Sequence, residues 1–165
     1  MIKAVCFDLG DTLVAEETVI HNSSGQAITA NMVADVIEVL ATIRKGGYKT
    51  AIIANGNSID ARNIIASCGL EEYFDVIVIS EELGIEKPDK GIFQSALDML
   101  KIEAANAVMV GNRIDADILG ANRMGMKSVW FHWNDRYEET IGSKEESPDF
   151  IIKSLSELPG LLSSM

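Results

Sequence analysis

Residues Lys3 to Val14 read KAVCFDLGDTLV, and this stretch decides the fold. Its first half is a short apolar run, typical of a β-strand that is covered on both faces. Asp8 follows the run directly, and Gly10 comes two residues later in a turn-like segment. We therefore expect a buried strand over Lys3–Phe7 that delivers Asp8 to one edge of a sheet.

Similar apolar runs recur along the chain, with helical patterns between them. The runs are Thr50–Ala54, Val76–Ile79, Ala107–Val110 and Ser128–Phe131, with a possible edge strand at Phe150–Ile152. The helical patterns are Met32–Arg44, Ile59–Cys68 behind Ser58 as its N-cap, a helix opened by Pro88, Ile118–Met124 and Leu155–Leu162. This alternation predicts an α/β fold with a doubly wound, Rossmann-like parallel sheet, in a single domain over residues 1–165.

The composition limits the classes of partner. The chain has 165 residues, is 47% hydrophobic and carries a formal net charge of -11. Such an acidic surface argues against a nucleic acid or an anionic membrane as partner. Cys6 and Cys68 lie among apolar residues and are expected to be free thiols. The N-terminus reaches Asp8 too soon for a signal peptide and no apolar run is long enough to span a bilayer, so we expect a cytoplasmic protein.

Polar residues follow the expected strands at the points where the strands end. Asp8 follows the first, Asn55-Gly56 the second, Lys87 a short loop after the third, and Asn112 to Asp117 the fourth. Each could be an ordinary cap or turn if taken alone. The carboxyl ends of parallel strands meet at one edge of a sheet, where open α/β sheets bind their ligands. Four such segments in order therefore predict a functional site.

Four motifs at these strand ends resemble those of a known family. They are FDLGDTLV (Phe7–Val14), IIANGNS (Ile52–Ser58), GIEKPDKGIF (Gly84–Phe93) and MVGNRIDADILGANRMGM (Met109–Met126). With this order and spacing, the sequence resembles the haloacid dehalogenase-like hydrolase superfamily over essentially its whole length. Most members are magnesium-dependent phosphatases that act through an aspartyl-phosphate. The resemblance therefore implies a phosphoric monoester hydrolase that uses Mg²⁺.

The resemblance assigns roles to individual residues. Asp8 matches the nucleophile, and Lys87 matches the lysine that offsets negative charge on Asp8 and the phosphoryl group. Mg²⁺ would be held by Asp8, the carbonyl of Gly10 and Asn112, which stands where the family has an acid. Asp117 matches the second acid of that motif, acting through water or by orienting Lys87.

The same resemblance places phosphate contacts in two other segments. Asn55 and Gly56 match the phosphate-binding turn, where backbone N–H groups can donate hydrogen bonds to phosphate oxygens. Ala54 stands where the family usually has a hydroxyl, so one donor is missing. Thr12 is expected to support phosphate binding by fixing the turn after Asp8.

Gly10 is the important departure from the family pattern. Phosphatases of this family usually carry a second aspartate there, which protonates the leaving oxygen and then activates water. Its loss predicts slow turnover, a good leaving group, an acid supplied from elsewhere, or a catalytically weak or inactive binding or regulatory domain. A 2-haloacid dehalogenase also needs no acid at that position. We rank dehalogenation lower, because those enzymes use an arginine near the nucleophile and no Lys or Arg lies between Lys3 and Arg44.

The segments where the family inserts a cap domain are short in this sequence. Residues Ala15 to Ala30 and Ser80 to Glu86 are too few to form a domain. We expect a protein without a cap domain and with an open site. Such a site suits a phosphorylated small molecule or macromolecule, and a second subunit of a homo-oligomer could cover it.

Overall fold

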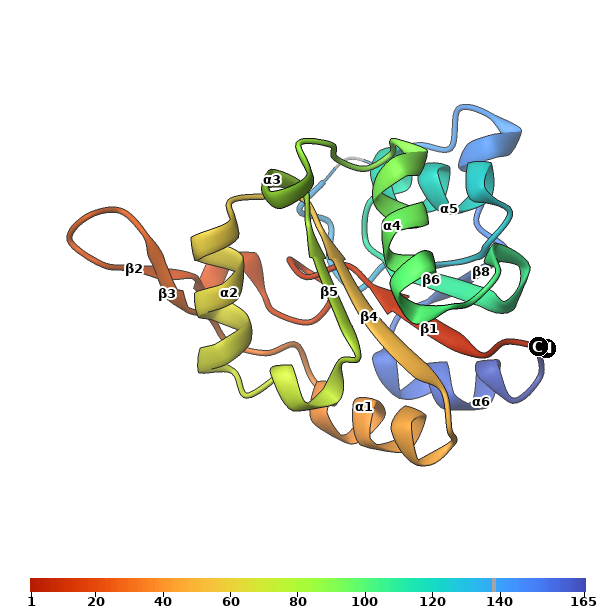
Figure 1. Cartoon of the computed structure of the whole chain (residues 1–165), viewed down its shortest axis with the longest axis horizontal. Coiled ribbons are helices and arrows are strands. Elements are labelled where there is room, and N and C mark those ends of the chain that lie inside the picture. The colour runs from red at the N-terminus through yellow and green to blue at the C-terminus, as the bar shows by residue number, and fades with distance from the viewer. Residues whose placement is uncertain (138) are drawn as a thin grey trace.

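The computed structural model describes residues 1–137 and 139–165 and has a six-stranded parallel sheet at its centre (Figure 1). Its strand order is β5-β4-β1-β6-β7-β8, and every neighbouring pair is parallel. The strands are β1 (Ala4–Phe7), β4 (Lys49–Ala54), β5 (Val76–Ile79), β6 (Ala107–Gly111), β7 (Lys127–Phe131) and β8 (Phe150–Ile152). The prediction of a doubly wound α/β sheet is confirmed. The order reverses between β1 and β6, so the carboxyl ends of these two strands form the topological switch point.

Helices cover both faces of the sheet (Figure 1). Val5 and Phe7 of β1 face one core with α1 (Val36–Lys45), α2 (Ser58–Ser67) and α6 (Leu158–Leu162). Ala4 and Cys6 face the opposite core, with α4 (Lys90–Leu100) and α5 (Leu119–Met124). Because successive side chains of a strand point to opposite faces, these apolar runs fill both cores, as the sequence predicts.

Two helices begin later than their patterns suggest. The prediction that a helix begins at Met32 is wrong: α1 begins at Val36, because Asp35 has a left-handed backbone with φ of 66°. The helix expected to open at Pro88 begins at Lys90 instead. Its N-cap is Asp89, whose carboxylate accepts a hydrogen bond from a backbone N–H of the first turn at 2.7 Å.

The N-cap of α2 also differs from the expectation. Asn57, and not Ser58, caps this helix, since its side chain accepts a hydrogen bond from the Asp60 N–H at 3.1 Å. Asn and Ser are comparable N-caps, so propensity alone does not separate two neighbouring candidates. Pro159 lies at the start of α6, directly after a 3-10 turn over Leu155–Glu157.

Short elements occupy the two segments that are too small for a cap domain. A hairpin of β2 (Ile20–His21) and β3 (Ala27–Thr29) lies beside α2, and the Ala27 N–H donates to Asp60 Oδ1 at 2.9 Å (Figure 1). The one-turn helix α3 (Ser80–Leu83) follows β5 directly. Neither element was expected from the sequence. Within residues 1–137 and 139–165, no helix has the length and hydrophobicity needed to cross a bilayer.

Candidate active site

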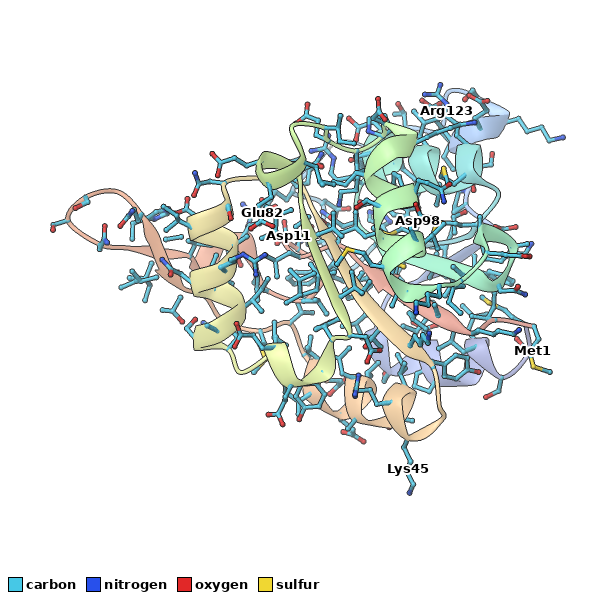
Figure 2. All side chains as sticks on the ribbon, viewed as in Figure 1. Met1, Asp11, Lys45, Glu82, Asp98 and Arg123 are labelled. Atoms are coloured by element: carbon cyan, nitrogen blue, oxygen red, sulfur yellow. The ribbon has the colours of Figure 1, made fainter. Side chains whose placement is uncertain are left out.

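A pocket of about 480 Å³ lies at the carboxyl edge of the sheet, around the switch point between β1 and β6. Its wall combines acidic, basic, amide and phenolic groups, including Asp8, Glu16, Asn55, Lys87, Arg113 and Tyr137. Figure 2 shows Asp11 among the side chains in the middle of the molecule, whereas Lys45 projects outward from the far end of α1. The topology thus brings the strand-end residues together, as the sequence predicts.

Lys87 occupies the centre of the charged cluster. Its Nζ donates to Asp8 Oδ1 at 2.7 Å, to Asp117 Oδ1 at 2.8 Å and to the Ile53 carbonyl at 2.7 Å. The side chain of Lys87 is 1% exposed, that of Asp117 is 0% exposed and that of Asp8 is 13% exposed. Three acceptors therefore satisfy all three ammonium hydrogens. All three side chains line the pocket, and Asp8 is the most exposed of them.

The cluster holds one ammonium between two carboxylates, and this excess of negative charge favours bound protons. Burial alone would lower the pKa of Lys87, but the charges of Asp117 and Asp8 outweigh it and raise that pKa. Burial and the charge of Asp8 raise the pKa of Asp117 to about 7, although Lys87 opposes the rise. Lys87 is therefore a fixed positive charge and not a proton donor near neutral pH.

Asn112 brings its amide close to two further oxygens. The amide faces Asp8 Oδ2 at 3.1 Å and the Gly10 carbonyl at 3.2 Å. If Nδ2 of Asn112 points toward these two oxygens, the amide donates a hydrogen bond to each of them. If Oδ1 points toward them, it forms a group of three oxygens with Asp8 Oδ2 and the Gly10 carbonyl. Cis oxygens around an octahedral Mg²⁺ lie about 2.9 Å apart, because each Mg–O bond is about 2.0–2.1 Å. The donor set therefore fits magnesium in one orientation of the amide and closes on itself through hydrogen bonds in the other.

Asp117 contacts the same ammonium as Asp8. Its Oδ2 accepts a hydrogen bond from the Arg113 backbone N–H at 3.0 Å, so both carboxylate oxygens have partners. Gly111 leaves the space for it, since a Cβ at Gly111 would lie 2.6 Å from the Asp117 Cβ. A π-helical turn over Ile114–Ile118 carries the side chain back toward β6. Asp117 is thus placed to orient Lys87.

The expected phosphate turn lines the pocket, and the Asn55 side chain and the Gly56 N–H already have partners. The Asn55 side chain accepts from the Lys87 N–H at 2.8 Å and donates to the Lys87 carbonyl at 3.0 Å. The Gly56 N–H donates to Ser80 Oγ at 2.9 Å. Asn55 therefore holds the backbone that carries the lysine, and Gly56 could bind a phosphate oxygen only by leaving Ser80.

Thr12 is buried and is not part of the pocket lining. Its N–H donates to the Leu9 carbonyl at 3.3 Å, within the turn after Asp8. Its hydroxyl is buried and has no hydrogen-bond partner among residues 1–137 and 139–165. The structure thus places Thr12 as a residue of the turn and gives it no direct route to a phosphate.

Glu16 is a pocket residue that the motifs do not indicate. A Cβ added at Gly10 would overlap Glu16 Oε1 and lie 2.8 Å from Glu16 Cγ, so this carboxyl fills the space above the glycine. The Tyr137 hydroxyl donates to Oε2 at 2.5 Å. Burial raises the pKa of Glu16, and the charges of Asp11 and Asp8 add to the rise. A glycine followed within a few residues by an acid is the only sequence signal that could have drawn attention to this contact.

Asp11 holds in place the part of the pocket wall that contains Tyr137. Its Oδ1 accepts from the Glu16 N–H at 3.0 Å and its Oδ2 pairs with Arg136 Nε at 2.7 Å. The Asp11 carbonyl accepts from Trp133 Nε1 at 2.7 Å. The side chain is 0% exposed and the backbone φ is 51°. These contacts fix residues 133–137 against the loop that carries Glu16.

Comparisons with known proteins identify the family of this chain. Residues 16–131 match the family model of the haloacid dehalogenase-like hydrolases. The chain is 38% identical over 125 residues to the glyceraldehyde 3-phosphate phosphatase of Pyrococcus furiosus, covering 76% of this chain and 50% of that protein. It is 32% identical over 135 residues to the N-acylneuraminate-9-phosphatase of Mus musculus, covering 81% and 53%. The chain thus spans about half the length of the curated relatives it matches.

Solved structures share the fold. A HAD phosphatase from Thermococcus onnurineus superposes with a TM-score of 0.83 at 24% identity over 98% of both chains. The L-2-haloacid dehalogenase from Xanthobacter autotrophicus also gives a TM-score of 0.83, at 17% identity over the whole of both chains. At these identities the likeness shows a common fold, and it does not separate a phosphatase from a dehalogenase.

Proposed function

The chain belongs to the haloacid dehalogenase-like hydrolase family, and from this premise we propose that it is a magnesium-dependent phosphoric monoester hydrolase that acts through an aspartyl-phosphate on Asp8. The observation that carries the proposal is the buried ammonium of Lys87 between Asp8 and Asp117 in the wall of an open pocket. The sequence relatives support phosphate ester hydrolysis, since their names are those of phosphatases. The names concern longer proteins, of which the match covers about half, so the activity of the whole protein is part of the proposal.

Asp8 is the nucleophile in this proposal. Its carboxylate faces the pocket and attacks phosphorus in line with the leaving oxygen. Lys87 reduces the repulsion between the carboxylate and the phosphate, because its fixed charge lies 2.7 Å from Asp8 Oδ1. Asp117 and the Asn55 side chain hold the lysine and its backbone in place.

Asp8, the Gly10 carbonyl and Asn112 would hold Mg²⁺. When bound, the ion supplies positive charge beside the phosphoryl oxygens. Asn112 contributes a neutral oxygen, so the protein ligands carry one negative charge from Asp8, and Asp117 acts on this site through Lys87. The Gly56 N–H would donate to a phosphate oxygen after exchanging its bond to Ser80, while Thr12 keeps the turn in shape.

We propose a phosphorylated small molecule as the substrate class. The pocket of about 480 Å³ is open to solvent and the β2-β3 hairpin forms part of its wall, through His21 and Ala27. A phosphorylated macromolecule, or closure of the pocket by a second copy of this chain, is compatible with the same opening. The acidic surface favours neither nucleic acid nor anionic lipid.

One observation favours a second candidate, a binding or regulatory domain without turnover. The N–H groups of Gly56 and Ser58, at the start of α2, already donate to Ser80 Oγ at 2.9 Å and to Glu81 Oε2 at 2.7 Å. Protein acceptors thus engage two N–H groups that could otherwise donate to a phosphate. This candidate predicts that beryllium fluoride with magnesium, a phosphate mimic, leaves the melting temperature unchanged.

Hydrolysis of p-nitrophenyl phosphate in the presence of magnesium tests the proposal. We expect activity that is lost in Asp8→Asn and retained in Asp98→Asn, an aspartate on α4 whose partner is Gln94 (Figure 2). Activity of Asp8→Asn equal to that of the unmodified chain would contradict the proposed nucleophile. Metal-independent release of chloride from 2-chloropropionate would indicate a dehalogenase instead.

A further inference from the structure

Hydrolysis of an alkyl phosphate needs a proton donor for the leaving oxygen, and few acids of the pocket are free to supply one. Asp8 is the nucleophile, and both oxygens of Asp117 are engaged inside the protein. Asp115 is paired with an arginine on the rim and is 61% exposed. Asp60 accepts a hydrogen bond from the β2-β3 hairpin. Glu16 is the remaining carboxyl of the pocket wall.

The position of Glu16 depends on the absence of a side chain at Gly10. A Cβ at Gly10 would overlap Oε1 of Glu16 and lie 3.0 Å from its Cδ. The carboxyl therefore occupies the volume directly beside the backbone two residues after the nucleophile. This volume faces the same pocket as Asp8. The residue that fills it, Glu16, comes six positions after Gly10 in the chain.

Two contacts orient the Glu16 carboxyl. The Tyr137 hydroxyl donates to Oε2 at 2.5 Å, and Asp11 Oδ1 accepts from the Glu16 backbone N–H at 3.0 Å. Within residues 1–137 and 139–165, no group donates a hydrogen bond to Oε1. The oxygen on the Gly10 side is thus available to carry a proton, while the other is held.

We propose that Glu16 is the general acid and base of the reaction, in place of a side chain at position 10. This inference rests on the proposed phosphatase function. In the first step an Asp8 oxygen forms a bond to phosphorus, the bond from phosphorus to the leaving oxygen breaks, and Glu16 gives its proton to that oxygen. In the second step Glu16 takes a proton from water, whose oxygen attacks phosphorus. The bond from phosphorus to Asp8 then breaks, which releases inorganic phosphate and leaves Glu16 protonated as at the start.

Rapid mixing of Glu16→Gln with two substrates tests the assignment. Glutamine keeps the shape of the side chain and can still accept from Tyr137, so the fold is preserved. p-Nitrophenolate leaves without a proton, so this variant should release about one equivalent of it in a burst and then turn over about 10²–10⁴-fold more slowly than the unmodified chain. β-Glycerol phosphate has an alkoxide leaving group and should give neither a burst nor turnover. The acid-quenched variant should carry one phosphoryl group after the burst.

Two variants complete the design. Glu17→Gln changes the neighbouring acid, which is 69% exposed, pairs with Arg136 and lies outside the pocket, and it should behave like the unmodified chain. Gly10→Asp combined with Glu16→Ala moves the acid to position 10. It should recover turnover that Glu16→Ala alone lacks, because the alanine vacates the volume that a Cβ at Gly10 requires.

The outcomes separate this inference from the proposed function. If the unmodified chain hydrolyses neither substrate, the phosphatase proposal fails and the role of Glu16 falls with it. A second outcome is an active unmodified chain with a Glu16→Gln variant that turns over both substrates as fast as the unmodified chain does. That result overturns the role of Glu16 and leaves the phosphatase proposal intact. A Glu16→Gln variant that is folded and inactive without a burst, or that binds magnesium more weakly in a thermal titration, also overturns it, because Glu16 would then serve binding and not proton transfer.

Discussion

The ammonium of Lys87 lies 2.7 Å from Asp8 Oδ1, and this pair joins two residues that are 79 positions apart in the chain. The same ammonium also contacts Asp117, so two carboxylates share one buried positive charge. This arrangement gives Asp8 an electrostatic setting in which an anionic phosphate can approach. It also makes the stability of the protein depend on the charges of its site.

Lys87→Met should abolish hydrolysis and destabilise the protein. Removing the ammonium leaves two carboxylates without their partner, and breaking a buried pair in this way typically costs about 3–5 kcal/mol. Urea unfolding measures the change. Adding Asp117→Asn to Lys87→Met should recover part of the loss, because one of the unpaired charges is then absent.

The exposed pair of Lys127 and Asp149 provides the control. Their side chains are 49% and 31% exposed, so Lys127→Met should change the free energy of unfolding by less than about 1 kcal/mol. Equal effects of the two lysine substitutions would show that the buried cluster does not carry the energy assigned to it.

Asn112→Asp should increase the stabilising effect of magnesium. Without the ion, the new carboxylate faces Asp8 Oδ2 and the Gly10 carbonyl with no donor, which should lower the free energy of unfolding by about 1–3 kcal/mol. With magnesium chloride, the added negative charge should strengthen binding by about tenfold, equal to about 1.4 kcal/mol. Thermal unfolding with and without the ion checks both signs. A magnesium response identical to that of the unmodified chain would remove Asn112 from the ion site.

Gly111→Ala should inactivate the protein without altering any group of the reaction. A Cβ there would lie 2.3 Å from the position of Asp117 Cγ, so the carboxylate must move away from Lys87. Such overpacking costs about 1–3 kcal/mol. Gly160→Ala is the matched control, because nothing lies within 4 Å of its added Cβ and alanine favours the α6 helix. Gly111→Ala should be less stable in chemical unfolding and less active than Gly160→Ala. Equal stability and activity of the two variants would show that the space at Gly111 is not needed to position Asp117.

Cys6 should make the protein less stable at alkaline pH. Both cysteines are free thiols, and burial raises the pKa of the Cys6 thiol from 9.0 to about 12. The thiol contributes its full stabilisation below its pKa in the unfolded protein. This contribution is lost by about 1.4 kcal/mol per pH unit as the pH rises toward the pKa in the folded protein. Cys6→Ala should therefore lose less stability than the unmodified chain between pH about 8 and about 10.5. Parallel loss in both proteins would show that Cys6 does not contribute.

The sheet was predictable because its strands are apolar on both faces. Val76–Ile79 was located to the residue, and the other strand boundaries differ by one residue at most from the structure. The hairpin of β2 and β3 escaped prediction, since it is short, exposed at Ile20–His21 and held by a contact with α2. Asp35 has a left-handed backbone, and α1 therefore begins after it and not at Met32. The residue pattern does not predict this backbone conformation.

The charged cluster was predictable because each member lies in the segment that follows a strand, Asp8 directly and Lys87 and Asp117 a few residues later. The topology alone brings Asp8, Lys87 and Asp117 within hydrogen-bond distance. Glu16 was not predictable, because its role arises from space left by Gly10 and from a contact with Tyr137, 121 positions away. The orientation of the Asn112 amide likewise depends on whether a cation is present, and the sequence does not contain that information.

The most direct test of the account is the identity of the residue that receives the phosphoryl group. The reaction of the unmodified chain with p-nitrophenyl phosphate and magnesium would be quenched in acid during turnover, digested and analysed by mass spectrometry. We expect a phosphoryl group on the peptide that contains Asp8 and none on the same peptide of Asp8→Asn. Turnover with no phosphorylated peptide, or with the phosphoryl group on another residue, would contradict it.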